Sequence, residues 1–97
     1  MAQVVYSERV FADLERLVDF LAESDKKAAL ETLSTIQEAV SILERHPLIG
    51  RSCEQGLREL VISRGHTGYI ALYDFIETDD AVLVLAIRHQ REAGYIE

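Results

Sequence analysis

Six consecutive apolar residues, Val82 to Ile87, constrain the fold more than any other feature of the sequence. The run is far shorter than the ~20 apolar residues that a membrane-spanning helix needs. It has no polar side to expose, so it predicts a central strand that is covered on both faces. We expect this strand to extend from Ala81 to about His89 and to lie inside a layered structure.

Two further strand-like segments precede this run, and turn residues bound each of them. They extend from Leu57 to Ser63 and from Tyr69 to Glu77, and the second is rich in aromatic and β-branched side chains. Tight turns at residues 65–68 and 78–80 join the three segments. Connections as short as these predict an antiparallel meander.

The first half of the chain has the periodicity of two amphipathic helices. One follows Ser7, a helix-capping residue, after a short strand-like segment from Gln3 to Tyr6. The other follows Ser24, which we expect to cap it, and runs to about Arg45, before Pro47 ends it. The short junction between them predicts an antiparallel hairpin that covers one face of the sheet.

Together these elements predict an α+β fold in the order β-α-α-β-β-β, with a helical hairpin packed on a small antiparallel sheet. The 97 residues fit one domain that spans residues 1–97. Residues 46–56 are expected to form a connecting loop. A chain of this length buries only about 60–65% of its extended surface. Its core is therefore thin, and a partner that covers apolar surface would stabilise it.

The composition argues against several classes of function. A net charge of −7 and a pI of about 4.9 disfavour nucleic-acid binding through bulk charge. His46, His66, His89 and the single Cys53 lack metal-ligand spacing, and no phosphate-binding glycine pattern is present. We therefore expect no metal, no cofactor and no internal disulfide. The lack of a leader-like or membrane-length segment favours the cytoplasm.

Arginines in the second half of the chain are the candidates for chemistry. Every basic side chain after residue 44 is an arginine, which binds carboxylate or phosphate through forked hydrogen bonds. An Arg–His–Arg–Tyr cluster follows the buried strand, where it can hold an anion and move a proton. The candidate residues are Arg58, Arg64, Arg88, His89, Arg91 and Tyr95. The alternative reading, which spacing alone favours, is that these arginines pair with carboxylates at strand ends.

Several short motifs occur in a fixed order along nearly the whole chain. They are Val5-Tyr6-Ser7, His46-Pro47-Leu48-Ile49-Gly50-Arg51, Leu57 to Ile62, Tyr69-Ile70-Ala71-Leu72-Tyr73 and Val84 to Glu92. In this order they resemble the RelE/ParE superfamily of bacterial toxins from type II toxin–antitoxin systems, often labelled plasmid-stabilisation proteins. The strongest part of the resemblance is the closing strand with Arg88, His89 and Arg91, joined to the stretch from Pro47 to Arg51.

The resemblance implies a β-α-α-β-β-β fold and growth arrest by the free protein. It implies neutralisation by a small antitoxin encoded beside it, whose disordered tail folds over the toxin. The expected assembly is a toxin–antitoxin hetero-oligomer that contacts DNA only through the antitoxin. No cofactor and no membrane partner are implied.

Two activities occur in the superfamily, and the residue type at position 70 helps to distinguish them. The RelE-like branch cuts mRNA in the ribosomal A site with basic residues and a Tyr or His, whereas the ParE-like branch poisons DNA gyrase. Ile70 stands where the family usually carries an arginine that would hold the scissile phosphate. We therefore expect a gyrase inhibitor without catalytic residues.

Two alternatives stay open at this point. One is a ribonuclease that uses the six candidate residues. The other is a weakly toxic or non-toxic interaction module of the same fold. For target contact, the candidate surfaces are the helical hairpin and the C-terminal run.

Overall fold

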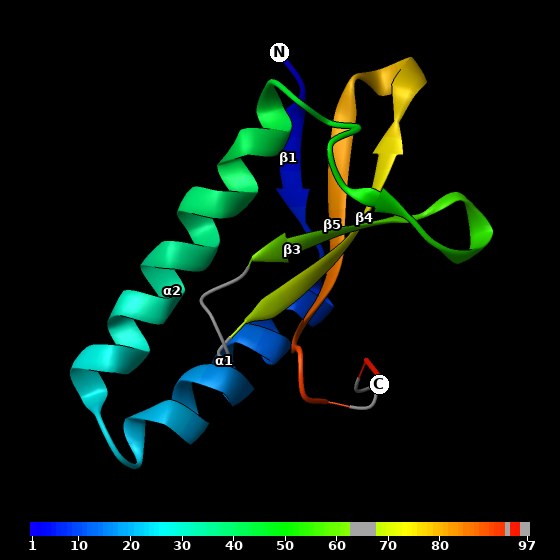
Figure 1. Cartoon of the computed structure of the whole chain (residues 1–97). Helices are drawn as coiled ribbons and strands as arrows, with labels where there is room; N and C mark the ends of the chain where they lie inside the picture. The colour runs from blue at the N-terminus through cyan, green and yellow to red at the C-terminus, as the bar shows by residue number, and fades with distance from the viewer. Residues whose placement is uncertain (63–67, 93, 96–97) are drawn as a thin grey trace.

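The computed structural model describes residues 1–62, 68–92 and 94–95, and it has the predicted α+β architecture (Figure 1). Two α-helices form the hairpin, and strands make up one sheet beside it. The elements are β1 Gln3–Tyr6, α1 Glu8–Ala22, α2 Lys26–Ser41, β2 Arg51–Ser52, β3 Arg58–Ile62, β4 Tyr69–Ile76 and β5 Ala81–His89, with 3₁₀ turns η1 Ile42–Glu44, η2 Glu54–Gly56 and η3 Glu77–Asp79. No described helix is both long and apolar enough to cross a membrane.

The sheet has the strand order β1-β5-β4-β3-β2. Strands β3, β4 and β5 form the predicted antiparallel meander. Strand β1, however, pairs in parallel with β5, with Tyr6 opposite Val84, so the predicted all-antiparallel sheet is wrong in this respect and the sheet is mixed. The reason is that β5 is apolar on both faces, which favours a central position in the sheet with a neighbouring strand at each edge. The helical hairpin supplies the long crossover that a parallel pair requires.

A register shift in β5 decides which side chains face the helices. Tyr73 pairs with Val84 and Leu72 with Ala86, so Leu85 is an extra residue in β5. Such a bulge reverses the alternation of side chains beyond it. As a result Ile87 shares the helix-covered face with Val84, and the next residue along β5 points to the opposite face.

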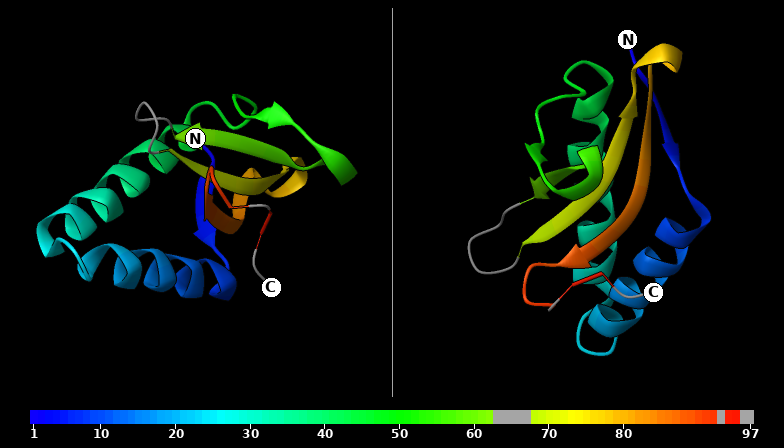
Figure 2. Two further views of the ribbon diagram at one scale, coloured as in Figure 1. Left: turned by 60° about the horizontal axis from the view of Figure 1, so that its bottom comes forward. Right: turned by 90° about the vertical axis from the view of Figure 1, so that its right-hand side faces the viewer.

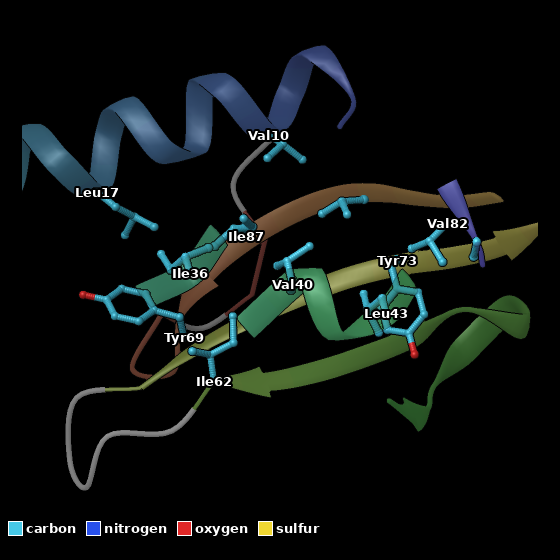
Figure 3. Packing of buried hydrophobic residues seen from close by; sticks show 13 residues of the cluster. Val10, Leu17, Ile36, Val40, Leu43, Ile62, Tyr69, Tyr73, Val82 and Ile87 are labelled. Carbon is cyan, nitrogen blue, oxygen red and sulfur yellow. The ribbon is translucent and has the colours of Figure 1, made fainter. Parts of the chain in front are cut away.

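The core lies between the hairpin and one face of the sheet (Figure 3). In the right-hand view of Figure 2 the strands stand in front of α2. Tyr73 is fully buried, and Tyr69, further back along β4, is buried in the same cluster. Phe75 packs against this cluster, so the row of aromatic side chains along β4 lies on the core side. The helices contribute Val10, Leu17, Ile36 and Val40.

The helix caps differ from the predicted ones. Asp25, not Ser24, caps α2: its Oδ1 accepts hydrogen bonds from Lys27 N at 3.0 Å and Ala28 N at 3.2 Å. A carboxylate is the stronger acceptor for these free N–H groups and carries a charge that favours the helix N-terminus. Ser7 precedes α1 as expected, but its side chain makes no capping bond.

The predicted loop 46–56 also contains regular structure. Arg51 and Ser52 form the short edge strand β2, which pairs with Glu59 and Arg58 of β3. Two residues of strand carry too little periodicity for the sequence to mark them. The turn predicted at residues 65–68 lies outside the described residues except for Gly68.

Candidate functional site

Polar side chains of α1 continue the sheet where β1 stops. Strand β1 ends at Tyr6, whereas β5 runs on to His89 and would leave main-chain groups unpaired. Ser7 fills the gap: its N–H donates to Val84 O at 3.0 Å, and its hydroxyl donates to Leu85 O at 3.2 Å. Further along α1, Asp13 accepts the N–H of Ile87 at 2.9 Å. Helix α1 thereby fixes the end of β5 from its open side.

Asp13 is the buried charge that sequence reasoning missed. It is only 4% exposed, and its carboxylate also meets Arg16 at 3.4 Å. Its position three residues after Val10 places it on the apolar side of α1, which was the one signal available. Arg16 of the same helix turns towards β5 and reaches Ile87 O at 3.4 Å.

Glu92 ties the residues after β5 back to α1. One carboxylate oxygen accepts the N–H of His89 at 2.8 Å, and the other accepts from Arg16 at 2.8 Å. Burial alone would raise the pKa of Glu92, but the hydrogen bond from His89 and the bond and charge of Arg16 lower it below its usual value. The turn after β5 is therefore held by an ionised carboxylate.

Arg88 points to the side of the sheet opposite the helical hairpin, here called the helix-free face. There it supports the turn after β5. It donates to three main-chain carbonyl oxygens, those of His89 at 3.3 Å, Gln90 at 3.4 Å and Glu92 at 2.9 Å. Its guanidinium carbon also lies 5.1 Å from the centre of the Tyr95 ring, within cation–π range. All three hydrogen bonds come from Nη1, whereas the buried Nε makes no hydrogen bond within the described part of the chain.

Tyr95 crosses the helix-free face. Its ring lies against Arg88 of β5, and its hydroxyl donates to Glu59 of β3 at 2.6 Å. Because β4 lies between those two strands, the Tyr95 side chain must span β4. Burial raises the pKa of Tyr95, and the hydrogen bond and charge of Glu59 raise it further. The hydroxyl is therefore a donor at neutral pH, and a poor proton acceptor.

Ile70 lies beneath this crossing. It pairs with Arg88 on one side and with Val61 on the other, so it faces away from both helices. Neither α-helix of the described structure covers that face, yet Ile70 is only 4% exposed. An arginine at position 70 would place a second guanidinium directly opposite Arg88, where like charges repel. The aliphatic side chain thus matches the closed arrangement around it.

Arg58 is on the other face of the sheet from Arg88. It pairs in register with the buried Tyr73, and it donates to Leu48 O at 3.2 Å and Gly50 O at 2.8 Å. Tyr73 completes this arrangement by accepting the N–H of Gly50 at 2.8 Å. Arg58 therefore holds the backbone of a loop.

His89 and Arg91 lie near the helical hairpin. His89 pairs with Tyr69, and the two rings meet edge to face with centroids 5.3 Å apart. The Nδ1 atom of His89 accepts the N–H of Arg91 at 3.0 Å, which leaves Nε2 as the other polar atom of the ring. Arg64 lies outside the described residues. The described candidates thus divide into Arg88 with Tyr95, His89 with Arg91, and Arg58 alone.

A groove of about 770 Å³ opens between the hairpin and the end of the sheet. Apolar side chains from both helices line it, and charged or polar side chains from the end of β5 form one wall. The lining includes Leu17, Phe20, Leu21, Ala28, Arg16, His89, Arg91 and Glu92. Phe20 is 72% exposed, which is a large apolar area to leave in water. Such a groove suits a protein segment with apolar side chains and a carboxylate.

Two further observations limit the chemistry of the described residues. Among residues 1–62, 68–92 and 94–95, no three His, Cys, Asp or Glu side chains cluster as metal ligands would. Burial, together with the charges of Glu59 and Glu54, raises the pKa of the Cys53 thiol. A thiol with a raised pKa is a weak nucleophile.

Residues 4–94 match the family described as the ParE toxin of the type II toxin–antitoxin system parDE. Two toxins of Caulobacter vibrioides are 33% identical to this chain. Toxin RelE3 aligns over 92 residues, which are 95% of this chain and 98% of that protein. Toxin RelE2 aligns over 89 residues, which are 92% of this chain and 96% of that protein.

Solved structures share the fold. The chromosomal ParDE toxin–antitoxin system from P. aeruginosa matches with a TM-score of 0.77 at 22% identity, over 92% of this chain and 96% of that one. The intact E. coli RelBE toxin–antitoxin complex matches with a TM-score of 0.63 at 13% identity, over 100% and 99% of the two chains. The resemblance predicted from the motifs is confirmed, and this chain belongs to the ParE toxin family of type II toxin–antitoxin systems, within the RelE/ParE superfamily.

Proposed function

We propose that the free protein arrests growth by binding and inhibiting DNA gyrase in the cytoplasm, without cutting RNA itself. The observation that carries this proposal is that Tyr95 crosses the helix-free face and that a buried aliphatic side chain, Ile70, stands where a phosphate-binding arginine would be needed. Arg88, the register partner of Ile70, already donates three hydrogen bonds to main-chain carbonyl oxygens through Nη1, which favours a structural role for it over phosphate binding. Under this proposal the protein inhibits gyrase by binding to it and catalyses no reaction itself.

The dispersal of the other candidate residues supports the same proposal. Phosphodiester cleavage needs an acid or base and a phosphate-binding cation around one reacting group. Arg58 faces the helix-covered side of the sheet and is engaged by the loop at Gly50, whereas Arg88 and Tyr95 are on the opposite face. The net charge of −7 also disfavours docking into ribosomal RNA.

The antitoxin partner belongs to this proposal. The two solved structures that share the fold are titled as toxin–antitoxin systems or complexes. The groove between the hairpin and the sheet offers an apolar floor with Arg16, His89 and Arg91 beside it. We propose that a segment of an antitoxin encoded beside this protein occupies the groove and forms a hetero-oligomer, which contacts DNA only through the antitoxin.

A ribonuclease is the second candidate. The two relatives at 33% identity are named RelE2 and RelE3, and His89 lies beside Arg91 on the wall of an open groove. For this function Arg58, Arg64, Arg88, His89, Arg91 and Tyr95 are the candidate residues. The joint substitution of Arg88→Ala and His89→Ala should then abolish codon-positioned cuts in translated mRNA.

One pair of assays separates the two functions. The purified protein is titrated into a DNA gyrase supercoiling reaction, and in parallel into a translation reaction whose mRNA is mapped by primer extension. We expect loss of supercoiling or accumulation of cleaved DNA, with intact mRNA. Unaffected supercoiling at a large molar excess of the protein, together with cut mRNA, would favour the ribonuclease.

A further inference from the structure

The loop from His46 to Gly50, here called the anchored loop, has a backbone that is fixed from beneath. The N–H of Gly50 donates to the buried Tyr73 hydroxyl, and Arg58 donates to the carbonyl oxygens of Leu48 and Gly50. A Cβ atom on Gly50 would lie 2.5 Å from the Tyr73 hydroxyl and 2.9 Å from Glu59 O. Only glycine therefore allows the loop to approach the sheet so closely.

The side chains at the tip of the anchored loop point into solvent. Leu48 is 57% exposed and Ile49 is 54% exposed, although the backbone between them is held. Ile42, just before the loop, is a further exposed aliphatic residue. A chain with a thin core loses stability by leaving such side chains in water. Fixing them in place lowers the entropy cost of a later contact, which is how rigid recognition loops gain affinity.

The charges around the tip specify the kind of partner. Residues 45–51 carry Arg45 and Arg51 and no acidic residue, within a chain of net charge −7. Both arginines are exposed, although Arg51 meets the half-buried Glu59 at 3.2 Å. An aliphatic tip flanked by arginines complements an apolar protein surface with acidic side chains at its edge.

We propose that the anchored loop is the surface through which the toxin docks on its target protein, at an apolar patch bordered by acidic side chains. This inference rests on the proposed toxin action. It separates two surfaces of the molecule: the groove between the hairpin and the sheet receives the antitoxin, and the anchored loop meets the target. Arg58 is a positioning residue in this arrangement, because it acts only through the loop backbone.

The test is a growth-arrest assay with the full chain expressed without antitoxin. The double variant Leu48→Ser with Ile49→Ser should raise the expression needed for arrest at least about tenfold, as expected when two central contacts are lost. Both side chains are exposed, so the melting temperature should stay close to the wild-type value. The matched control is Leu30→Ser on α2, an apolar side chain that is 66% exposed, and it should arrest growth like the wild type.

Any of three results in the growth assay would overturn the inference: arrest by the double variant at wild-type expression, an equal loss of arrest in Leu30→Ser, or no arrest by the wild type. Loss of antitoxin capture by the tagged double variant would also overturn it, because the loop would then belong to the antitoxin interface. Supercoiling assays separate this inference from the proposed target. If the wild type arrests growth without affecting gyrase, gyrase is the wrong target. The role of the anchored loop in binding the target is then tested by the growth assay alone.

Discussion

The anchored loop and the turn after β5, described at residues 90–92 and 94–95, both combine an arginine with a tyrosine. In each, the arginine, Arg58 or Arg88, donates to main-chain carbonyl oxygens. The Tyr73 hydroxyl accepts the N–H of Gly50 in the loop, whereas the Tyr95 ring lies against Arg88 and its hydroxyl donates to the Glu59 carboxylate. The two regions differ in what they leave exposed. The anchored loop presents apolar side chains to solvent, whereas the turn lays Tyr95 across the sheet. Two arginines that suggest catalysis in sequence, Arg58 and Arg88, thus fix backbone in both places.

The sharpest test of this comparison removes each tyrosine in turn. Tyr73 is fully buried, so Tyr73→Ala should lower the free energy of unfolding by about 3–5 kcal/mol, as large-to-small core substitutions do. Tyr95→Ala removes a side chain that lies across the surface of the sheet, and we expect less than about half of that loss. Urea denaturation followed by circular dichroism measures both. Similar losses for the two variants would show that the regions are equally part of the core.

Two glycines offer a smaller and closely matched comparison. Gly50→Ala forces a methyl group against the Tyr73 ring and Glu59 O, and overpacking of this kind costs about 1–3 kcal/mol. Gly94→Ala meets no atom within 4 Å, so its unfolding free energy should change by less than about 0.5 kcal/mol. Thermal melts of the two variants test the difference. A Gly50→Ala protein as stable as the wild type would contradict the close approach of the anchored loop.

The smallest expected effect concerns pH and the turn after β5. Because folding lowers the pKa of Glu92, its stabilisation is present above the unfolded pKa of about 4.3 and is lost as the pH falls through the folded value. Glu92→Gln should therefore cost about 0.5–1 kcal/mol at pH 7, with a smaller deficit near pH 3. Urea denaturation at the two pH values measures it, with the exposed Glu23→Gln as the matched control. A deficit that does not shrink in acid would mean that Glu92 acts by packing alone.

The sequence predicted most of the fold because hydrophobic periodicity reports burial directly. The bounds of β1 and β5 agree with the expected strands, Gln3–Tyr6 and Ala81–His89. The parallel pairing of β1 with β5 was not predicted, because periodicity says which face is buried and does not say which strand lies alongside. The two-residue strand β2 was missed because pairing with β3 defines it, and its own composition does not.

The candidate site was less predictable than the fold. Arg88 and His89 lie on opposite faces of the sheet, as their register partners Ile70 and Tyr69 show, and strand alternation makes such a division readable from sequence. The partners of the arginines were not predictable, since Arg58 binds main-chain oxygens that carry no sequence signal. Asp13 shows the same limit: its partner is the N–H of Ile87, 74 positions away.

The pairing of the first strand with the last sets the order in which the molecule can assemble. Ser7 bonds to Leu85 across 78 positions, and Arg16 bonds to Glu92 across 76. Contacts between such distant parts of a chain form slowly and cannot guide early collapse. During synthesis, β1 and α1 can therefore reach their final positions only after β5 has been made. A fragment that stops before Ala81 lacks the strand on which β1 and α1 pack, so we expect it neither to fold nor to arrest the growth of the cell that makes it.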